Sequence, residues 1–440
     1  MKSICLFMLL IFASTSCESK TQGNSAPKYL IHESSKELQT YNEVLKNFKL
    51  SSTDLEKDTI DATKFNVVAD YNGRKGTDNR YALQLAIDYC SANNKVLKLP
   101  KGKIYVNSYG LTPSAKAHAN IIELKSNTNI IGNDSEIVVG AYFLDKAFVL
   151  LSGLNAVEIS EFSELKNISI KNISFNFNNT KVYMVSNYQL MRGIELGHLI
   201  NGEVSNCTFF NGDLTAAIIT GQGNKDISKN VKIHDNKFIN LIKSEKNQDH
   251  TSVYLNSQNS SIYNNVFTNT SKQGKIVACA GELHNSNTSF YNNSISGYLR
   301  MNFVAAQTIE NHNIKNLSIY NNTARLTSAG IYLWTEDNTS ISDIVIRNNH
   351  FFSSHIDGYT MFYNGTQGIL GDSRVGKNAK IINLTVENNK TNILKTIIKG
   401  RAVNFMLESD RVITNFVERN NICNGCTDGK YYQSGFRWPF

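Results

Sequence analysis

Three short segments of the chain bring together side chains that can move protons and hold an anion. They read Asp249-His250-x-x-x-Tyr254, Glu282-x-His284 and Arg300-x-Asn302. A guanidinium holds a carboxylate through two hydrogen bonds, an imidazole accepts a proton near neutral pH, and a phenol can protonate a leaving oxygen. The set suits β-elimination at a uronate of an acidic polysaccharide. Arg300 would hold the carboxylate, His284 or His250 would be the base, and Tyr254 the acid.

Hydrolysis of a glycosidic bond is the competing interpretation of the same residues. It requires two carboxyl groups, one of which is protonated. Glu282 and Asp249 are the candidates, with Glu195 in reserve. Because exposed aromatic rings stack on sugars, we also expect a set of residues that contacts the substrate. That set is Tyr254, Glu195, Asn302, Tyr332 and Trp334.

From about residue 160 onward the chain repeats a motif of the form apolar-x-Asn-x-x-apolar, as in Ile262-Tyr-Asn-Asn-Val-Phe267. Its copies begin at Ile170, Val204, Ile233, Ile262, Phe290, Ile319, Ile346 and Val386. Two positions later stand Asn172, Asn206, Asp235, Asn264, Asn292, Asn321, Asn348 and Asn388. Five positions later stand Phe175, Phe209, Phe238, Phe267, Ile295, Ala324, Phe351 and Thr391.

These columns predict a solenoid. A repeat of about 29 residues made of short β-rich runs cannot bury its apolar side alone, but stacked coils can. Asparagine tolerates the left-handed backbone of a tight turn, and its amide can bond to the asparagine of the next coil. We therefore predict an all-β fold, a right-handed parallel β-helix with an asparagine ladder. It would occupy residues 59–440, with the repeated coils over 160–425.

The run before each repeat is expected to be the first strand of its coil. These runs are 193–196, 252–255, 280–284, 303–305 and 330–334. Strand alternation sends Glu195, Tyr254, Glu282 and Tyr332 outward, one above another at about 4.8 Å per coil. His250, His284, Arg300, Asn302 and Trp334 flank the same face. With two coils between them, Glu195 and Glu282 would lie about 9–10 Å apart, a separation typical of inverting hydrolases.

The segment before the repeats resembles the opening module of pectate-lyase-like β-helix proteins. Asp70-Tyr-Asn-Gly73 begins a Gly/Asp loop, Ala82–Tyr89 is an amphipathic helix, and Leu99-Pro100-Lys-Gly102-Lys-Ile-Tyr105 is a strand. The loop has Lys75-Gly76-Thr77 where that superfamily commonly has Asp-Gly. Over residues 60–110 the resemblance implies a helix that caps the open end of the cylinder. It also implies a substrate groove on the outward strand face described above.

The N-terminus predicts export. Met1-Lys2, an apolar run to Ala13 and small residues before Cys17 form a secretory signal over residues 1–16. Small residues before a cysteine resemble the lipobox of bacterial lipoproteins, although Ser14 stands where leucine is preferred. The resemblance implies lipidation of Cys17 and a location in the bacterial cell envelope, at the outer membrane or in the periplasm. Residues 17–58 would be a tether. An ordinary signal peptide cut near Cys17 is the alternative.

Cysteine usage fits an oxidising compartment. Cys423 and Cys426 are close enough in sequence to form a small-loop disulfide. Cys90, Cys207 and Cys279 lie in apolar surroundings and are expected in the core. A single Cys-x-x-Cys pair is weak support for a zinc site.

Composition narrows the partners. With 41% hydrophobic and 19% charged residues, the 440-residue chain can bury a large core. The net charge of +8 suits an acidic polysaccharide, and we expect no nucleic-acid partner and a monomer. No run after the signal approaches 18 apolar residues, so the lipid on Cys17 is the only membrane contact expected. We expect no required cofactor. Calcium could bind Asp249, Glu195 and Glu282, but no spacing demands it.

Three functions therefore stay open. Basic charge and the His, Arg and Tyr content slightly favour a polysaccharide lyase, as does the absence of the clustered aspartate motifs of polygalacturonases. The motif of calcium-dependent pectate lyases is also missing, so the substrate need not be pectate. A glycoside hydrolase is the first rival, and a uronate C5-epimerase is a chemical relative of the lyase. A non-catalytic carbohydrate-binding or adhesive β-helix is the rival from another class.

Overall fold

The computed structural model describes most of the chain after residue 55. The described residues are 56–109, 119–144, 146–153, 164–180, 184–185, 188–189, 191–221, 225–243, 249–270, 277–298, 300–306, 313–327, 329–353, 367–393, 401–407, 413–424 and 431–434. The predicted signal with Cys17, and all but the last residues of the predicted tether, lie outside them.

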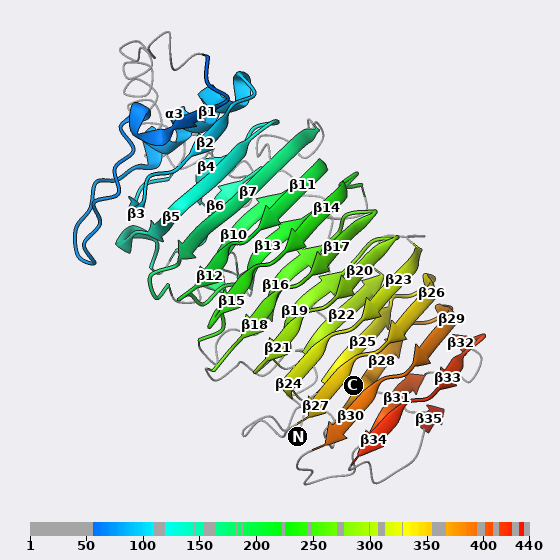
Figure 1. Ribbon diagram of the computed structural model, residues 1–440. Coiled ribbons are helices and arrows are strands. Elements are labelled where there is room, and N and C mark those ends of the chain that lie inside the picture. The colour runs from blue at the N-terminus through cyan, green and yellow to red at the C-terminus, as the bar shows by residue number, and fades with distance from the viewer. Residues whose placement is uncertain are drawn as a thin grey trace, which may run out of the picture.

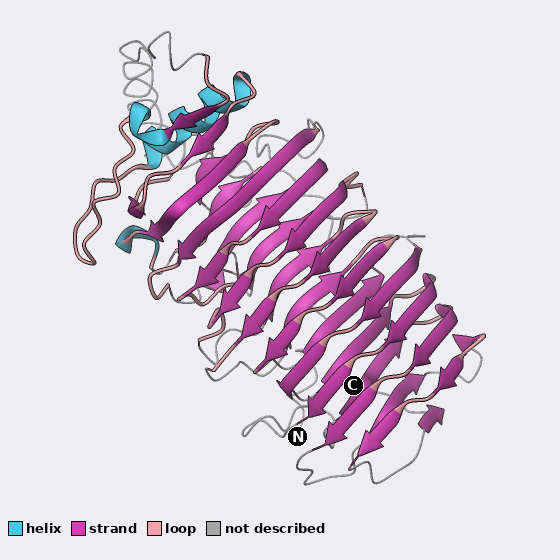
Figure 2. Cartoon of the chain, viewed as in Figure 1, coloured by secondary structure: helices cyan, strands magenta, loops and turns pink. Residues whose placement is uncertain are grey.

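The chain winds into a long cylinder of stacked coils, a right-handed parallel β-helix as predicted (Figures 1 and 2). Two parallel sheets form its wall, which we call sheet A and sheet B; over the described residues they have 22 and 11 strands, respectively. A complete coil contributes one strand to sheet B and two to sheet A. This order confirms that each repeated motif is preceded by a separate strand.

Sheet B contains the first strand of each coil. In chain order its strands are β4 (Ala119–Glu123), β6 (Phe148–Ser152), β10 (Met191–Leu196), β13 (Ala216–Thr220), β16 (Asp249–Leu255), β19 (Val277–Leu283), β22 (Arg300–Ala306), β25 (Ala329–Thr335), β28 (Gln367–Val375), β31 (Arg401–Leu407) and β35 (Tyr431–Ser434).

Sheet A contains the repeated motifs. Its strands are β1 (Thr59–Asp61), β2 (Val96–Lys98), β3 (Gly102–Val106), β5 (Asn129–Val139), β7 (Leu165–Asn176), β11 (Leu199–Ser205), β12 (Thr208–Phe210), β14 (Lys229–His234), β15 (Lys237–Ile239), β17 (Ser260–Tyr263), β18 (Val266–Thr268), β20 (Thr288–Tyr291), β21 (Ser294–Ser296), β23 (Ile314–Tyr320), β24 (Thr323–Thr327), β26 (Ser340–Arg347), β27 (His350–Ser353), β29 (Lys380–Glu387), β30 (Lys390–Ile393), β32 (Ile413–Thr414), β33 (Val417–Arg419) and β34 (Ile422–Asn424).

The predicted capping helix is α3 (Arg80–Ala92), at the N-terminal end of the cylinder (Figure 1). Its Gln84 amide donates to the carbonyl of Glu123 at 2.8 Å and accepts from the Glu123 backbone N–H at 2.8 Å. Gln84 thus satisfies backbone groups at the edge of β4, the first strand of sheet B. The remaining described elements are η1 (Ala62–Phe65), η2 (Ala141–Phe143), β8 (Met184–Val185) and β9 (Tyr188–Gln189).

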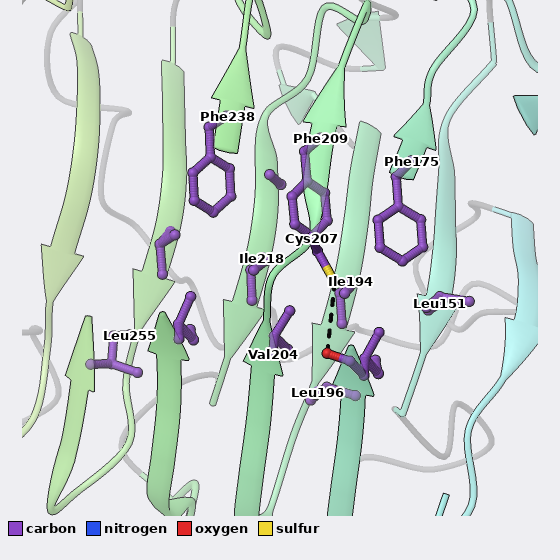
Figure 3. Close-up of a cluster of buried hydrophobic side chains, with 14 of the residues drawn as sticks. Leu151, Phe175, Ile194, Leu196, Val204, Cys207, Phe209, Ile218, Phe238 and Leu255 are labelled. Atoms are coloured by element: carbon purple, nitrogen blue, oxygen red, sulfur yellow. Dashed lines mark hydrogen bonds between the residues drawn. The ribbon is translucent and has the colours of Figure 1, made fainter. Parts of the chain in front are cut away.

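The core is a column of aromatic rings, as the repeat predicts. Phe175, Phe209, Phe238 and Phe267 stack with centroids 4.9, 5.1 and 4.7 Å apart (Figure 3 shows the first three). Each ring is buried, and the aliphatic residues of sheet B face it across the cylinder. Cys207 lies below Phe209 with its thiol near the carbonyl of Ile170, and burial raises the pKa of this thiol to about 12.

The other cysteines also follow the prediction where the structure describes them. Cys90, Cys207 and Cys279 are buried and not disulfide-bonded. Cys423 is disulfide-bonded. Cys426, its predicted partner, lies outside the described residues.

The asparagines form a ladder, but one residue beyond the predicted column. The predicted column takes the left-handed conformation, as in Asn264 and Asn292 with φ of 56° and 55°. The ladder consists of the buried residues that follow: Asn236, Asn265, Asn293, Asn322, Asn349, Asn389 and Asn421. The Asn265 amide donates to Asn293 Oδ1 at 3.1 Å and to the Ile233 carbonyl at 3.0 Å. The left-handed residue turns the chain, and so directs its neighbour's amide into the wall.

Candidate functional site

The outer face of sheet B carries the predicted site residues in one column. The strand register pairs Glu195 with Ile219, Ile219 with Tyr254, and Tyr254 with Glu282. It then continues through Phe303 to Tyr332. The prediction that Glu195, Tyr254, Glu282 and Tyr332 lie one above another is confirmed.

The predicted separation of Glu195 and Glu282 is wrong. A coil whose sheet B strand is β13 lies between β10 and β16, so three strand spacings separate the two carboxylates. At about 4.8 Å per strand their backbones are about 14 Å apart, beyond the range of an inverting pair. This coil is not apparent from the sequence, because Ala216–Thr220 carries no charged or aromatic residue to mark it.

The side chains of sheet B do not alternate strictly between the inside and the outside of the cylinder, and the alternation is interrupted at the same place in successive strands. In β16, Ser252 and Val253 both face the interior, while Thr251 and Tyr254 lie on the outer face. In β19, Ala280 lies in the core, and a side chain at Gly281 would meet the core ring of Phe290. Glu282 then faces outward. The outer face therefore presents residues three apart, instead of every second residue.

The outer-face residues of β16 and β19 form one hydrogen-bonded cluster. Thr251 Oγ1 donates to Glu282 Oε1. Glu282 Oε2 accepts from His284 Nε2 at 2.8 Å. The Tyr254 ring stacks on the His284 ring with centroids 4.1 Å apart. We call Thr251, Tyr254, Glu282 and His284 the outer-face cluster.

The hydrogen bonds of this cluster fix its chemical state. Both carboxylate oxygens of Glu282 accept, which suits an ionised carboxylate rather than a protonated acid. The proton of a neutral His284 ring then lies on Nε2, and the lone pair that can accept a proton lies on Nδ1. His284 is fully buried and Glu282 nearly so, whereas Tyr254 is half-buried and its ring lies on that of His284. The cluster is thus a histidine oriented by a carboxylate beneath a tyrosine.

His250 does not belong to this face, and its predicted role as a base on the outer face is wrong. Its Nδ1 donates to the Leu214 carbonyl at 2.7 Å, and its Nε2 lies 2.9 Å from Ser252 Oγ. Ser252 Oγ in turn contacts the buried Tyr298 hydroxyl at 2.8 Å. The break in alternation turns His250 into the cylinder, where burial lowers its pKa to about 4, against a smaller opposing effect of the Leu214 hydrogen bond.

Glu195 lies on the outer face, as predicted, and its carboxylate forms an ion pair there. Its Oε1 lies 2.5 Å from Arg192 Nη1, and both side chains are almost fully buried. Arg192 stands three residues earlier on the same face, because of the same break in alternation. A carboxylate held by a buried guanidinium stays ionised and is a poor general acid. The structure thus shows Glu195 bound to Arg192 on the outer face, and its role toward a substrate stays a prediction.

The backbones of three further predicted residues adjoin the outer-face cluster. Asp249 pairs with Val277 at the start of β16, Arg300 pairs with Cys279, and Asn302 pairs with Gly281. Arg300 and Asn302 thus lie on β22, the strand next to Glu282. The side chains of Asp249, Arg300 and Asn302 lie outside what the structure describes, and their roles stay predictions.

The aromatic residues on β25 continue the face toward the C-terminus. Tyr332 is nearly buried, and Trp334 is half-buried with its ring 6.2 Å from that of Tyr332. Tyr332 stands two strands beyond Glu282 in the same column. Together with Tyr254, Trp334 gives the face a half-exposed aromatic ring on each side of Glu282.

The described residues hold no group of three or more His, Cys, Asp or Glu side chains placed to bind a metal ion. The same residues include no helix long and apolar enough to cross a membrane. A hollow lined by Gly132, Asn133, Asp134, Asn172 and their neighbours lies in the wall of sheet A, away from the outer-face cluster.

Sequence reasoning missed two residues of the face, Thr251 and Arg192. Both stand three positions before a predicted site residue, Tyr254 and Glu195 respectively. The spacing of three is visible in the sequence only once the break in alternation is known. Neither residue type signals chemistry on its own.

Known structures share the fold. No protein-family model matches the chain, and no curated protein sequence matches it. It is similar to a mutant tailspike protein of E. coli bacteriophage HK620, with a TM-score of 0.72 and 22% identity, over 87% of this chain and 64% of that one. Two further structures of mutant HK620 tailspikes, in complex with a hexasaccharide and a pentasaccharide, have TM-scores of 0.66 and 0.64 at 22% identity, each over 84% of this chain and 66% of that one. The chain thus spans just under two thirds of the tailspike chains.

Proposed function

We propose that this protein is a carbohydrate-active β-helix that binds an acidic polysaccharide on the outer face of sheet B and cleaves it by β-elimination. One observation carries the proposal, which is the outer-face cluster with its carboxylate-oriented histidine. The basic net charge of +8 supports an anionic substrate. The oligosaccharides bound to the similar tailspike mutants support a carbohydrate ligand.

In this proposal His284 is the base. The lone pair on Nδ1 takes the proton from C5 of a uronate, and the electrons left behind form the C4–C5 double bond. The bond from C4 to the glycosidic oxygen breaks, and the Tyr254 hydroxyl protonates that oxygen. Glu282 does not touch the sugar, because both of its oxygens already accept hydrogen bonds.

Arg300 is the proposed partner of the uronate carboxylate. Its strand, β22, adjoins the strand of Glu282. A guanidinium that binds this carboxylate disperses the negative charge that develops after C5 loses its proton, which lowers the barrier to proton removal.

Tyr254 must also control access in this scheme. Its ring covers His284, which is fully buried. The sugar would therefore displace the phenol from the imidazole, which at the same time moves the Tyr254 hydroxyl toward the leaving oxygen. Trp334 on β25 would support a neighbouring sugar ring.

The cluster gives less support to hydrolysis. Glu282 accepts two hydrogen bonds as an ionised carboxylate, and Glu195 is about 14 Å away and bound to Arg192. Asp249 remains the one sequence-predicted carboxyl partner that this geometry does not remove.

Binding without cleavage is the second candidate function, because His284 is fully buried in this structure. In an adhesive β-helix the half-exposed rings of Tyr254 and Trp334 would hold the glycan, and the Glu282–His284 pair would only stabilise the face.

The proposal is tested by incubating the purified protein with a panel of uronate-containing polymers. β-Elimination produces ultraviolet absorbance from the new C4–C5 double bond, and His284→Ala should abolish it while glycan binding persists. New reducing ends without that absorbance would establish hydrolysis instead. Binding without either product would establish the adhesive function.

We further propose that a lipid on Cys17 anchors the protein in the bacterial cell envelope. The support is the signal-like sequence before Cys17. Mass spectrometry of the mature N-terminus from membrane fractions of the native host tests it. A Cys17→Ser variant that still fractionates with membranes would contradict it.

A further inference from the structure

We propose that Thr251 is the positioning residue of the outer-face cluster. Its hydroxyl fixes the Glu282 carboxylate in the orientation that places the ring proton of His284 on Nε2. This inference rests on the proposed function for its catalytic consequence, but its structural part stands independently of that function.

The contact geometry assigns this role to the Thr251 hydroxyl. Thr251 Oγ1 donates to one Glu282 oxygen, and the other Glu282 oxygen accepts from His284 Nε2. A carboxylate bound at only one oxygen can rotate, whereas one bound at both is held in a single plane. Thr251 therefore acts on His284 through Glu282, without contacting the substrate.

Thr251 is itself held rigidly. Its backbone N–H donates to the Thr215 carbonyl at 2.9 Å, and its backbone pairs with Ala216 on one side and Cys279 on the other. It is 5% exposed, and a threonine on a strand has few χ1 rotamers to choose from. The hydroxyl thus approaches Glu282 from a fixed position on the neighbouring coil.

Packing alone does not explain a hydroxyl at this position. The neighbours of Thr251 in its own column are an alanine and a cysteine, both apolar. Valine has nearly the shape of threonine and would fill the same space. A buried hydroxyl among apolar neighbours is expected to have a hydrogen-bond partner, and here that partner is Glu282.

The test compares Thr251→Val, which removes the donor, with Thr251→Ser, which keeps it. Thr323→Val, the same change on the outer side of sheet A, is the matched control. We expect Thr251→Val to lower kcat by about 10- to 100-fold with KM changed less than about 2-fold, since loss of a group that orients a functional ligand costs about this much. Thr251→Ser should recover kcat to within about 3-fold, and Thr323→Val should leave it unchanged.

A second readout does not depend on activity. The ¹⁵N chemical shifts of the His284 ring should report one tautomer, protonated on Nε2, in the wild type and in Thr251→Ser. In Thr251→Val they should report a mixture of tautomers. If Thr251→Val does not fold, Thr251→Ala, which also lacks the donor, takes its place.

The two readouts separate the possible failures. Unchanged ring shifts in Thr251→Val would overturn the positioning role, whether or not the protein cleaves a polymer. Ring shifts that change as expected, in a protein that cleaves none of the polymers, would uphold the positioning role and reject the proposed reaction. A fall in thermal stability in both Thr251 variants, with unchanged tautomer and kcat, would show that the hydroxyl is merely structural.

Discussion

The outer faces of the two sheets are built in opposite ways. On sheet A an aromatic ring recurs from coil to coil: the rings of His234, Tyr263, Tyr291 and Tyr320 stack with centroids 4.6, 4.9 and 4.8 Å apart, and Arg347 lies over the last ring. Burial raises the pKa of Tyr263 and Tyr291 above the ordinary tyrosine value. Repetition lets every coil make the same contact with the next, so this face serves stability.

On sheet B the residue type changes at every coil. From β10 to β19 the column runs Glu195, Ile219, Tyr254 and Glu282, so each coil places a different residue type against the next. Its two charged residues are buried, and each has its own hydrogen-bond partner: Arg192 for Glu195 and His284 for Glu282. We therefore expect chemistry where the repeat is broken.

The largest difference in turnover should appear when the same substitution, Glu to Gln, is made on each of the two faces. Glu282→Gln removes the charge that orients His284, and we expect it to lower turnover by about 10³-fold, within the range of general acid–base catalysis. Glu203→Gln on sheet A, where the carboxylate contacts Lys171 and His234, should lower turnover less than about 2-fold. Initial rates on the cleaved polymer measure both. Equal losses in the two variants would remove the distinction between the faces.

The next largest effect should come from His250, on the inner side of sheet B, which makes the free energy of unfolding depend on pH. His250 has a folded-state pKa of about 4 against an ordinary 6.5, so between these values the unfolded chain binds the extra proton. The contribution of His250 to the free energy of unfolding is therefore fully present above about pH 6.5. It is lost as the pH falls toward 4, which lowers the free energy of unfolding by about 3 kcal/mol at most.

Denaturant unfolding at a series of pH values measures this slope. His250→Gln, which keeps hydrogen-bonding groups but does not titrate, should flatten the curve in this window. A curve of unchanged steepness in His250→Gln would mean that another group titrates there.

The asparagine ladder of sheet A should show a smaller, purely structural effect. Asn293→Ala removes the amide that bonds Asn322 Oδ1 and the Ile262 carbonyl, and we expect a loss of about 2 kcal/mol. Asn292→Gly, at the left-handed position next to it, should cost less, since glycine accepts that backbone conformation. Chemical denaturation compares them. A greater loss in Asn292→Gly would place the stabilising amides in the other column.

The half-buried tyrosine stack of sheet A should show the smallest effect. Tyr291→Leu removes two stacking contacts and should lower the free energy of unfolding by about 1 kcal/mol, without changing turnover or glycan affinity. Melting curves and a binding isotherm test this. Weakened glycan binding would mean that sheet A also holds substrate.

The sequence predicts those features of the fold that recur in every coil. The aromatic column, the left-handed asparagines and the outward positions of Glu195, Tyr254 and Glu282 follow from one register kept over many coils. The ladder fell one residue away because the motif offers two adjacent asparagines, and only the turn geometry decides which amide enters the wall.

Prediction from the sequence fails where the side chains of a strand do not alternate regularly between the two faces of the sheet. Alternation every second residue puts His250 outward, but the break at Ser252 and Val253 turns it inward and brings Thr251 out in its place. The β13 coil was missed because its strand contains no charged or aromatic residue. Such breaks depend on packing against the neighbouring coil, which no local sequence pattern records.

The central claim is that glycan binds the outer face of sheet B, and hydrogen exchange tests it most directly. Amide exchange of Glu282→Gln, measured with and without a uronate oligosaccharide from a bound polymer, should show protection confined to β16, β19, β22 and β25. Protection on the tyrosine-bearing strands β17, β20 and β23 of sheet A, with none on sheet B, would contradict the account.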